Sequence, residues 1–137
     1  MSDSIHVQHI DHVTVVVKNL NRSREFYVGL LGMTEVLRPS FSFAGAWFKA
    51  GATMLHLIEE HPQSGVAGTE SDRAHSSRCH HFAFEVANAR SAAQLLKDRG
   101  VPIIEDPKLR PDGAVQTFVG DPDGHLVELC STTILEV

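Results

Sequence analysis

The chain has 137 residues, 42% hydrophobic and 21% charged, which is enough for one globular domain with a substantial core. Its formal net charge is −5 and neither lysine nor arginine forms a run, so nucleic acid and anionic membrane surfaces are poor candidates for partners. No stretch approaches the roughly eighteen apolar residues of a membrane span, and the polar N-terminus lacks a signal-peptide pattern. A cytoplasmic protein that binds a small molecule is therefore expected.

Nine histidines are unusual in a chain of this length. The first half of the sequence predicts a strand, a helix and three further strands. In chain order these are a strand at residues 10–17, a helix from Asn19 or Asn21 to Gly32, and strands at 33–37, 41–49 and 53–58. The helix limits follow from asparagine as an N-cap and glycine as a C-terminal stop.

The same order of elements returns in the second half. It comprises a strand at 79–86, a helix from Asn88 to Gly100, a strand at 101–104, a loop at 107–113, and hairpin arms at 116–119 and 125–130. An offset of 69 residues (81 − 12) aligns His12 with His81, and an offset of 72 (128 − 56) brings His56 onto Glu128. The sequence therefore predicts a duplicated βαβββ unit and an α+β fold.

The hairpin arms are joined by residues 121–124, Asp-Pro-Asp-Gly, a sequence typical of a tight turn. Because side chains alternate along a strand, Glu128 shares an otherwise apolar face with Leu126 and Cys130. The desolvation of a lone carboxylate there would cost roughly several kcal/mol unless a cation compensates its charge. No lysine or arginine lies on that strand, so the histidines elsewhere suggest a metal.

Each half of the chain supplies one polar residue on its first strand and one on its last. These residues are His12 and His56 in the first half, and His81 and Glu128 in the second. All four lie on the faces opposite the side chains that pack against the helices. The pattern predicts that four ligand-type residues converge on one concave surface.

Five stretches of the sequence carry a resemblance to a known family. They are residues 10–17, 23–32, 54–58, 81–86 and 121–128. In these, the chain resembles the vicinal oxygen chelate superfamily, the glyoxalase, bleomycin-resistance and extradiol-dioxygenase group, over about residues 8–130. The resemblance implies two tandem βαβββ modules that form an open, curled sheet.

The resemblance further implies a single domain over 1–137. Module 1 would span about 8–60, a linker about 61–77, and module 2 about 78–131. Such chains are often homodimers, so that one subunit would lend His12 and His56 and its partner His81 and Glu128. These four residues match the ligand positions of the family, for a divalent ion that could be Zn, Ni, Co, Mn or Fe.

Among members of the superfamily, the chain is most similar to glyoxalase I, a lyase. In such an enzyme a metal-stabilised enediolate forms when a carboxylate ligand removes a proton beside a carbonyl, a catalytic role that would fall to Glu128. Two positions depart from the pattern. The second ligand is commonly Glu or Gln in that enzyme, where this chain has His56, and the arginine that holds glutathione is replaced by Val16. Dependence on glutathione is therefore in doubt.

Other activities in the superfamily stay open as alternatives. Extradiol dioxygenases bind Fe²⁺ with two histidines and a glutamate, and this chain has one histidine more. Fosfomycin-modifying members need a basic anion pocket, for which Lys108 and Arg110 are the loop candidates. Epimerases of acyl-CoA substrates are a further possibility. A non-catalytic module that binds a small ligand or a metal is the alternative outside the enzymes.

Several further side chains have both a functional and a structural interpretation. Glu85 could orient a ligand imidazole, or face solvent. Trp47 and Phe43 could line a substrate pocket, or pack in the core. Arg73 and Arg78 are expected to be solvated loop charges, although they could clamp a substrate carboxylate. His80 is expected to be structural and His125 to be exposed. No role is expected for His6, His9, His61 and His75.

Overall fold

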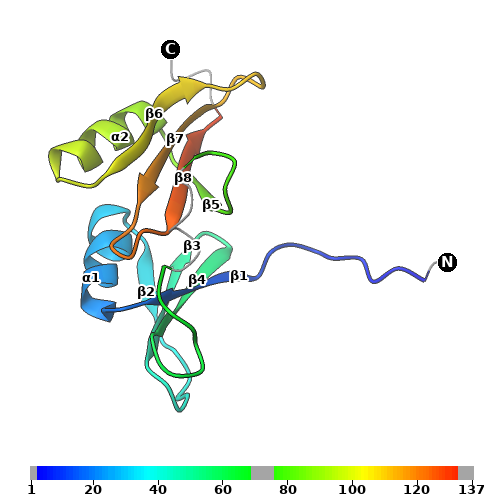
Figure 1. Cartoon of the computed structure of the whole chain (residues 1–137). Helices are drawn as coiled ribbons and strands as arrows, with labels where there is room; N and C mark the ends of the chain where they lie inside the picture. The colour runs from blue at the N-terminus through cyan, green and yellow to red at the C-terminus, as the bar shows by residue number, and fades with distance from the viewer. Residues whose placement is uncertain (1–2, 69–75, 133–137) are drawn as a thin grey trace.

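A computed structural model describes residues 3–68 and 76–132 of the chain. Arg73, His75 and the middle of the expected linker at 61–77 lie outside the described residues. The elements follow one another as β1 (His12–Val17), α1 (Leu20–Arg24), η1 (Glu25–Leu30), β2 (Thr34–Val36), β3 (Gly45–Ala50), β4 (Thr53–Glu59), β5 (Phe82–Glu85), α2 (Ala89–Asp98), β6 (Ile103–Leu109), β7 (Val115–Gly120) and β8 (Leu126–Ser131). Figure 1 shows the two halves stacked, with residues 3–11 extending away from both.

The strands form two four-stranded sheets with the same internal order. Sheet A has the order β1-β4-β3-β2, and sheet B has the order β5-β8-β7-β6. The pairs β1/β4 and β5/β8 are parallel, whereas the remaining pairs are antiparallel. This topology confirms the duplicated βαβββ pattern and the α+β fold. The outer sides of β1 and β5 pair with no other strand in the described part of the chain.

One hydrophobic core joins the helix-facing sides of both sheets. Phe48, Leu55 and Leu57 enter it from sheet A, and Val127 and Leu129 enter it from sheet B. The helices cover it with Phe26, Tyr27 and Leu96. Because alternate strand residues point to opposite faces, the sheets direct His12, His56 and Glu128 away from this core. The described part of the chain contains no helix long and apolar enough to cross a membrane.

The first helical segment is divided into two types of helix. Asn19 caps α1 as expected, its side chain accepting a hydrogen bond from the backbone N–H of Arg22 at 3.1 Å. The chain then widens into the π-helix η1, and Gly32 follows it with φ of +76°. Within η1 the consecutive residues Phe26 and Tyr27 are both buried, at 4% and 0% exposure. The π-helix thus directs two adjacent aromatic rings into the core.

The structure corrects three strand limits. Residues 107–109, expected in a loop, continue β6 to Leu109. Proline is compatible with this strand because β6 is the edge of sheet B, and the register shifts between Glu105 and Lys108 around Pro107. In addition, β3 begins at Gly45 and not at residue 41, and β5 is confined to Phe82–Glu85. Both strands are therefore shorter at their N-terminal ends than expected.

The turn between β7 and β8 is organised by a buried aspartate. The Oδ1 atom of Asp121 accepts hydrogen bonds from the backbone N–H groups of Asp123, at 2.9 Å, and His125, at 2.8 Å. Gly124 has φ of +86°, which an L side chain rarely adopts. These contacts confirm the turn expected at residues 121–124. Asp121 itself is only 5% exposed.

The same turn contacts the first module. The phenol of Tyr27 donates to Oδ2 of Asp121 at 2.6 Å, and the backbone N–H of Lys18 donates to Oδ1 of Asp123 at 3.0 Å. His125 is 3% exposed, with its Nε2 2.8 Å from the carbonyl oxygen of Val16. The expectation that His125 is exposed was therefore wrong. A residue after a turn is normally solvated, but this turn lies between the two modules.

Burial shifts the pKa of both partners in the Tyr27–Asp121 contact. Removal from water raises the pKa of the Asp121 carboxyl, and the N–H and O–H groups around it oppose this increase. The pKa of Tyr27 lies well above its usual value, because the phenol is buried and faces Asp121. The phenol therefore stays protonated and continues to donate to the carboxylate.

Tyr27→Phe should lower the free energy of unfolding by about 1–3 kcal/mol, because Oδ2 of Asp121 then loses its donor in a buried site. Urea denaturation of the variant and the parent measures the difference. In an Asp121→Asn background the same substitution should have a smaller effect, since the two side chains act together. Equal losses in both backgrounds would contradict the proposed coupling.

Candidate metal centre

The first pair of candidate ligands lies on sheet A. Strands β1 and β4 are parallel neighbours, and the rings of His12 and His56 stack with centroids 3.9 Å apart and an interplanar angle of 18°. Trp47, the register partner of His56 on β3, stacks on its other side at 4.0 Å and 3°. The imidazole of His56 is thus held between two other rings, which restricts its rotation.

The ring nitrogens of this pair are available to a metal. His12 Nδ1 lies 2.9 Å from Oδ2 of Asp11, so a proton on Nδ1 leaves the Nε2 lone pair free. His56 Nε2 is buried and finds no hydrogen-bond partner among the residues that the structure describes. Burial, followed by the nearby His12, lowers the pKa of His56 and favours its neutral form. A neutral imidazole with an unpartnered nitrogen is the form that binds a divalent ion.

Asp11 is a functional candidate that the sequence interpretation missed. The alternation of side chains places it on the face opposite His12, but it is the last residue before β1 and its carboxylate turns back to the ring. The hydrogen bond from His12 lowers the pKa of Asp11, so the carboxylate is charged and accepts a hydrogen bond from the Nδ1–H group of His12. An acidic residue directly before a candidate ligand histidine was the available signal.

The second pair of candidate ligands lies at the equivalent place on sheet B. His81 immediately precedes β5, Glu128 lies on the parallel neighbour β8, and His81 Nε2 is 3.0 Å from Oε1 of Glu128. His81 Nδ1 faces another acceptor, the carbonyl oxygen of Cys79, at 2.8 Å. A neutral imidazole has one N–H and can satisfy only one of these acceptors. A second proton, or a cation between Nε2 and Oε1, is needed to satisfy both.

Glu128 has a cationic partner in this structure. The carboxylate is 5% exposed, and its Oε2 accepts a hydrogen bond from Nη1 of Arg110 at 3.1 Å. The sequence interpretation noted correctly that β8 carries no lysine or arginine. It did not foresee that the β6–β7 hairpin brings Arg110 to this carboxylate, because such cross-strand contacts depend on the register. The available signal in the sequence was an arginine, Arg110, in the turn between β6 and β7.

Arg110 is in turn fixed by Asp112. Its Nε and Nη2 atoms donate to the two carboxylate oxygens of Asp112 at 3.1 and 2.6 Å. This contact lowers the pKa of Asp112 to about 2 and raises that of Arg110 above its usual value, with Glu128 as a smaller contributor to the latter. The guanidinium is therefore permanently charged where Glu128 needs compensation.

The four predicted ligands form two pairs and not one cluster. Among residues 3–68 and 76–132, no group of three or more His, Cys, Asp and Glu side chains is arranged to hold a metal ion. The expected convergence of His12, His56, His81 and Glu128 is therefore not found within a single chain. Each pair nevertheless has the donor chemistry of half a metal site, with imidazole nitrogens opposite a carboxylate or beside a second imidazole.

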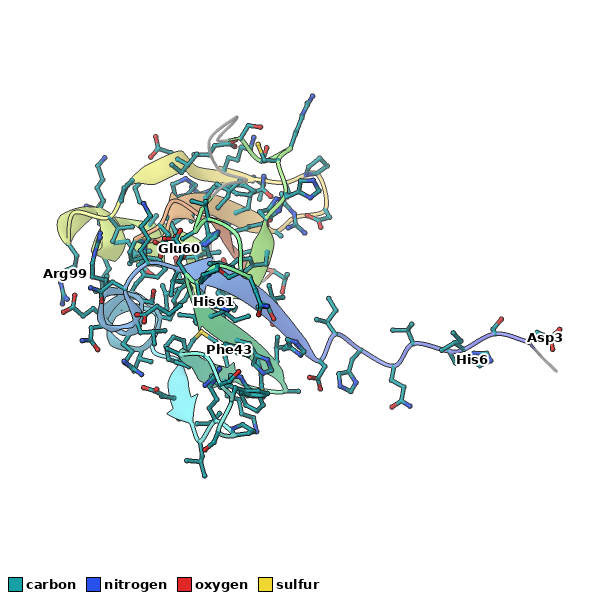
Figure 2. All side chains as sticks on the ribbon, turned by 60° about the horizontal axis from the view of Figure 1, so that its bottom comes forward. Asp3, His6, Phe43, Glu60, His61 and Arg99 are labelled. Atoms are coloured by element: carbon teal, nitrogen blue, oxygen red, sulfur yellow. The ribbon has the colours of Figure 1, made fainter. Side chains whose placement is uncertain are left out.

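The other candidate side chains have different partners. Glu85 accepts a hydrogen bond from the Thr132 hydroxyl at 3.2 Å, whereas the ring nitrogens of His81 face Cys79 and Glu128. Lys108 lies 3.7 Å from Glu105. Phe43 and His61, both labelled in Figure 2, stack with ring centroids 5.4 Å apart. Phe43 also packs in a group with the rings of Phe41 and Trp47 and the guanidinium of Arg38. His80 is exposed, as is Arg78.

Comparison with known proteins identifies relatives over most of the chain. The chain is 27% identical to "Glyoxylase I 4" of Arabidopsis thaliana, over 97% of this chain and 76% of that protein. It is 33% identical to the glutathione transferase FosA of Serratia marcescens, over 90% of this chain and 80% of that protein. A crystal structure assigned to a glyoxalase family protein of Bacillus anthracis is 30% identical, has a TM-score of 0.74, and matches 95% of this chain and 99% of that one.

These similarities agree with the topology of the two sheets. The sequence also matches the profile of a single family over residues 9–129, which includes His12, His56, His81 and Glu128. The chain belongs to the Glyoxalase/Bleomycin resistance protein/Dioxygenase superfamily.

Proposed function

We propose that this protein is a divalent-metal-dependent, glyoxalase-like lyase or isomerase that acts on a small bidentate substrate, one with two oxygen atoms placed to bind the same metal ion. The observation that carries the proposal is the pair of half-sites at equivalent places on the two sheets, His12 with His56 and His81 with Glu128. An unpartnered buried nitrogen on His56 supports metal binding at the first half-site. The glyoxalase name of the Arabidopsis relative supports the class of reaction.

In this proposal the site is completed by a second copy of the chain. One subunit contributes His12 and His56, and its partner contributes the partner's His81 and the partner's Glu128. The unpaired edges of β1 and β5 support this arrangement, because exposed strand edges are normally covered. An apolar cavity of about 590 Å³, lined by both edge strands, lies between them. A second copy would cover both features and join the half-sites.

The bound metal would act as a Lewis acid that polarises a substrate carbonyl. The residues of the chain supply the rest of the chemistry. Asp11 holds the His12 proton on Nδ1, and Trp47 keeps His56 in place. Glu128 removes the proton from the carbon beside the carbonyl and returns it to the neighbouring carbon, for which its buried position beside His81 is suited. Zn, Ni, Co, Mn and Fe are all compatible with three imidazoles and one carboxylate.

The proposal does not require glutathione as a co-substrate. Val16 occupies the position at which glyoxalase I has an arginine. The carbonyl oxygen of Val16 contacts Nε2 of His125. Screens should therefore include hemithioacetals of glutathione and of other thiols. Oxygen consumption with a catechol and Fe²⁺ would instead identify a dioxygenase. No turnover of any of these substrates, or of an acyl-CoA, with any of the metals would favour a binding module.

Glu128→Gln should abolish turnover by the metal-loaded protein, a fall of at least about 100-fold, because an amide cannot accept the substrate proton. Metal content at saturating metal should be largely preserved, since the amide oxygen remains a ligand. Steady-state kinetics and elemental analysis measure the two quantities. Glu85→Gln is the matched control, because Glu85 is an exposed carboxylate on the same sheet and should tolerate the change. Unchanged turnover in Glu128→Gln would exclude Glu128 as the base.

A mixture of two inactive variants tests whether the site is shared. His56→Ala and Glu128→Gln, refolded together, should regain about a quarter of the parent activity, because half of the dimers are then mixed and each has one intact site. The separate variants should stay inactive, and size-exclusion chromatography should show dimers throughout. If each chain held a whole site, mixing would leave every site damaged. Absence of recovery in verified mixed dimers would therefore exclude the shared site.

A further inference from the structure

Arg110 occupies the turn of the β6–β7 hairpin in a closely defined conformation. Its backbone N–H donates to the carbonyl oxygen of Ala114 at 2.6 Å, and the N–H of Gly113 donates back to its carbonyl oxygen at 3.0 Å. Gly113 has φ of +94°, which allows the tight turn. Asp112 binds two guanidinium nitrogens and also accepts the backbone N–H of Ala114 at 3.1 Å. The turn thus fixes the plane of the guanidinium.

The remaining nitrogen of this guanidinium, Nη1, reaches across to the next strand but one. It donates to Oε2 of Glu128, whose other oxygen, Oε1, faces Nε2 of His81. The two oxygens of Glu128 therefore have different partners. Only Oε1 lies beside the imidazole nitrogen that would bind a metal, while Oε2 is held on the opposite side by a permanent charge.

A simple surface ion pair does not account for this arrangement. Arg110 already has a two-point contact with Asp112, and a surface arginine needs no further partner. Glu128, at 5% exposure, does need one, because a buried carboxylate without compensation is strongly unfavourable. A planar guanidinium can bind both carboxylates at once from one rigid group, whereas the point charge of a lysine cannot keep the same geometry.

We propose that Arg110, fixed by Asp112, is the positioning residue of Glu128, holding Oε2 so that Oε1 alone is presented beside His81 Nε2. The proposal rests on the ligand role of Glu128 in the proposed function. It explains how a buried carboxylate is held in one orientation before a metal binds. Without Arg110 the carboxylate would be free to rotate, and both of its oxygens would be available as ligands in place of one.

The test is the affinity of the full-length protein for Co²⁺, measured against a competing chelator of known affinity. Arg110→Met should weaken binding by about 10-fold to 100-fold, the usual effect of losing a residue that orients a metal ligand. Arg110→Lys should weaken it also, because charge without the planar group does not fix the carboxylate. Arg99→Met is the matched control for charge, since Arg99 is an exposed residue after α2, on the helix side of sheet B.

The visible absorption of bound Co²⁺ gives a second readout. The intensity of its bands falls as the number of ligands rises, so weaker bands in Arg110→Met would report binding through both oxygens of Glu128. Far-UV circular dichroism verifies that each variant is folded. Arg110→Lys keeps the test decisive if Arg110→Met does not fold.

A double-mutant cycle separates this inference from the proposed function. Arg110→Met should change Co²⁺ affinity by less than about 2-fold in a Glu128→Gln background, because the carboxylate on which it acts is gone. If Glu128→Gln weakens affinity but Arg110→Met does not, the positioning role is overturned and the ligand role of Glu128 stands. If Glu128→Gln has no effect on affinity, both are overturned. Full affinity in Arg110→Lys, or equal effects of Arg110→Met in both backgrounds, would also overturn the positioning role.

Discussion

The relative placement of the two modules depends on the contacts that the buried carboxylate of Asp121 makes. This carboxylate organises its own turn through two backbone N–H groups and receives the phenol of Tyr27 from the other module. His125 and Asp123, within the same turn, add contacts to the β1 end of sheet A. Because the phenol is buried and its pKa is raised, it stays protonated and able to donate over the ordinary pH range. The modules are thereby joined on their helix sides.

This mode of joining has a direct consequence for the candidate site. The helix-facing sides of both sheets share one core, so the opposite sides, which carry the ligand-type residues, face outward. Parallel pairing of β1 with β4, and of β5 with β8, brings the two members of each pair together. It does not bring the pairs together. A duplicated fold packed in this way has two half-sites, with β1 and β5 each at the edge of a sheet, which is why a second copy is central to the proposed function.

The two half-sites differ in how they satisfy charge. The first contains two imidazoles, with His56 stacked between His12 and Trp47 and the pKa of His56 lowered by burial. The second contains a buried carboxylate that Arg110 compensates from a neighbouring hairpin. Together they would surround a divalent ion with one negative charge and three neutral donors. Arg110 contacts Oε2 of Glu128 and Asp11 contacts Nδ1 of His12, which leaves Glu128 Oε1 and His12 Nε2 as the atoms that would bind the ion.

Most of the fold followed from local patterns in the sequence. Capping by Asn19, the turn at residues 121–124, and the recurrence of His12 and His56 as His81 and Glu128 are properties of short stretches and of their spacing. The limits of β3, β5 and β6 could not be predicted as well, because strand ends depend on neighbouring strands, and Pro107 is tolerated only at an edge.

The sequence by itself therefore determined the duplicated topology, and its repeat predicted which four residues are candidate ligands. Only the tertiary structure decided that they lie in two separate pairs, that His125 is buried, and that Asp11 and Arg110 contact His12 and Glu128. The physical reason is that periodicity determines the face on which a side chain lies. Which side chains meet across strands and modules depends on register and on packing between residues distant in the chain.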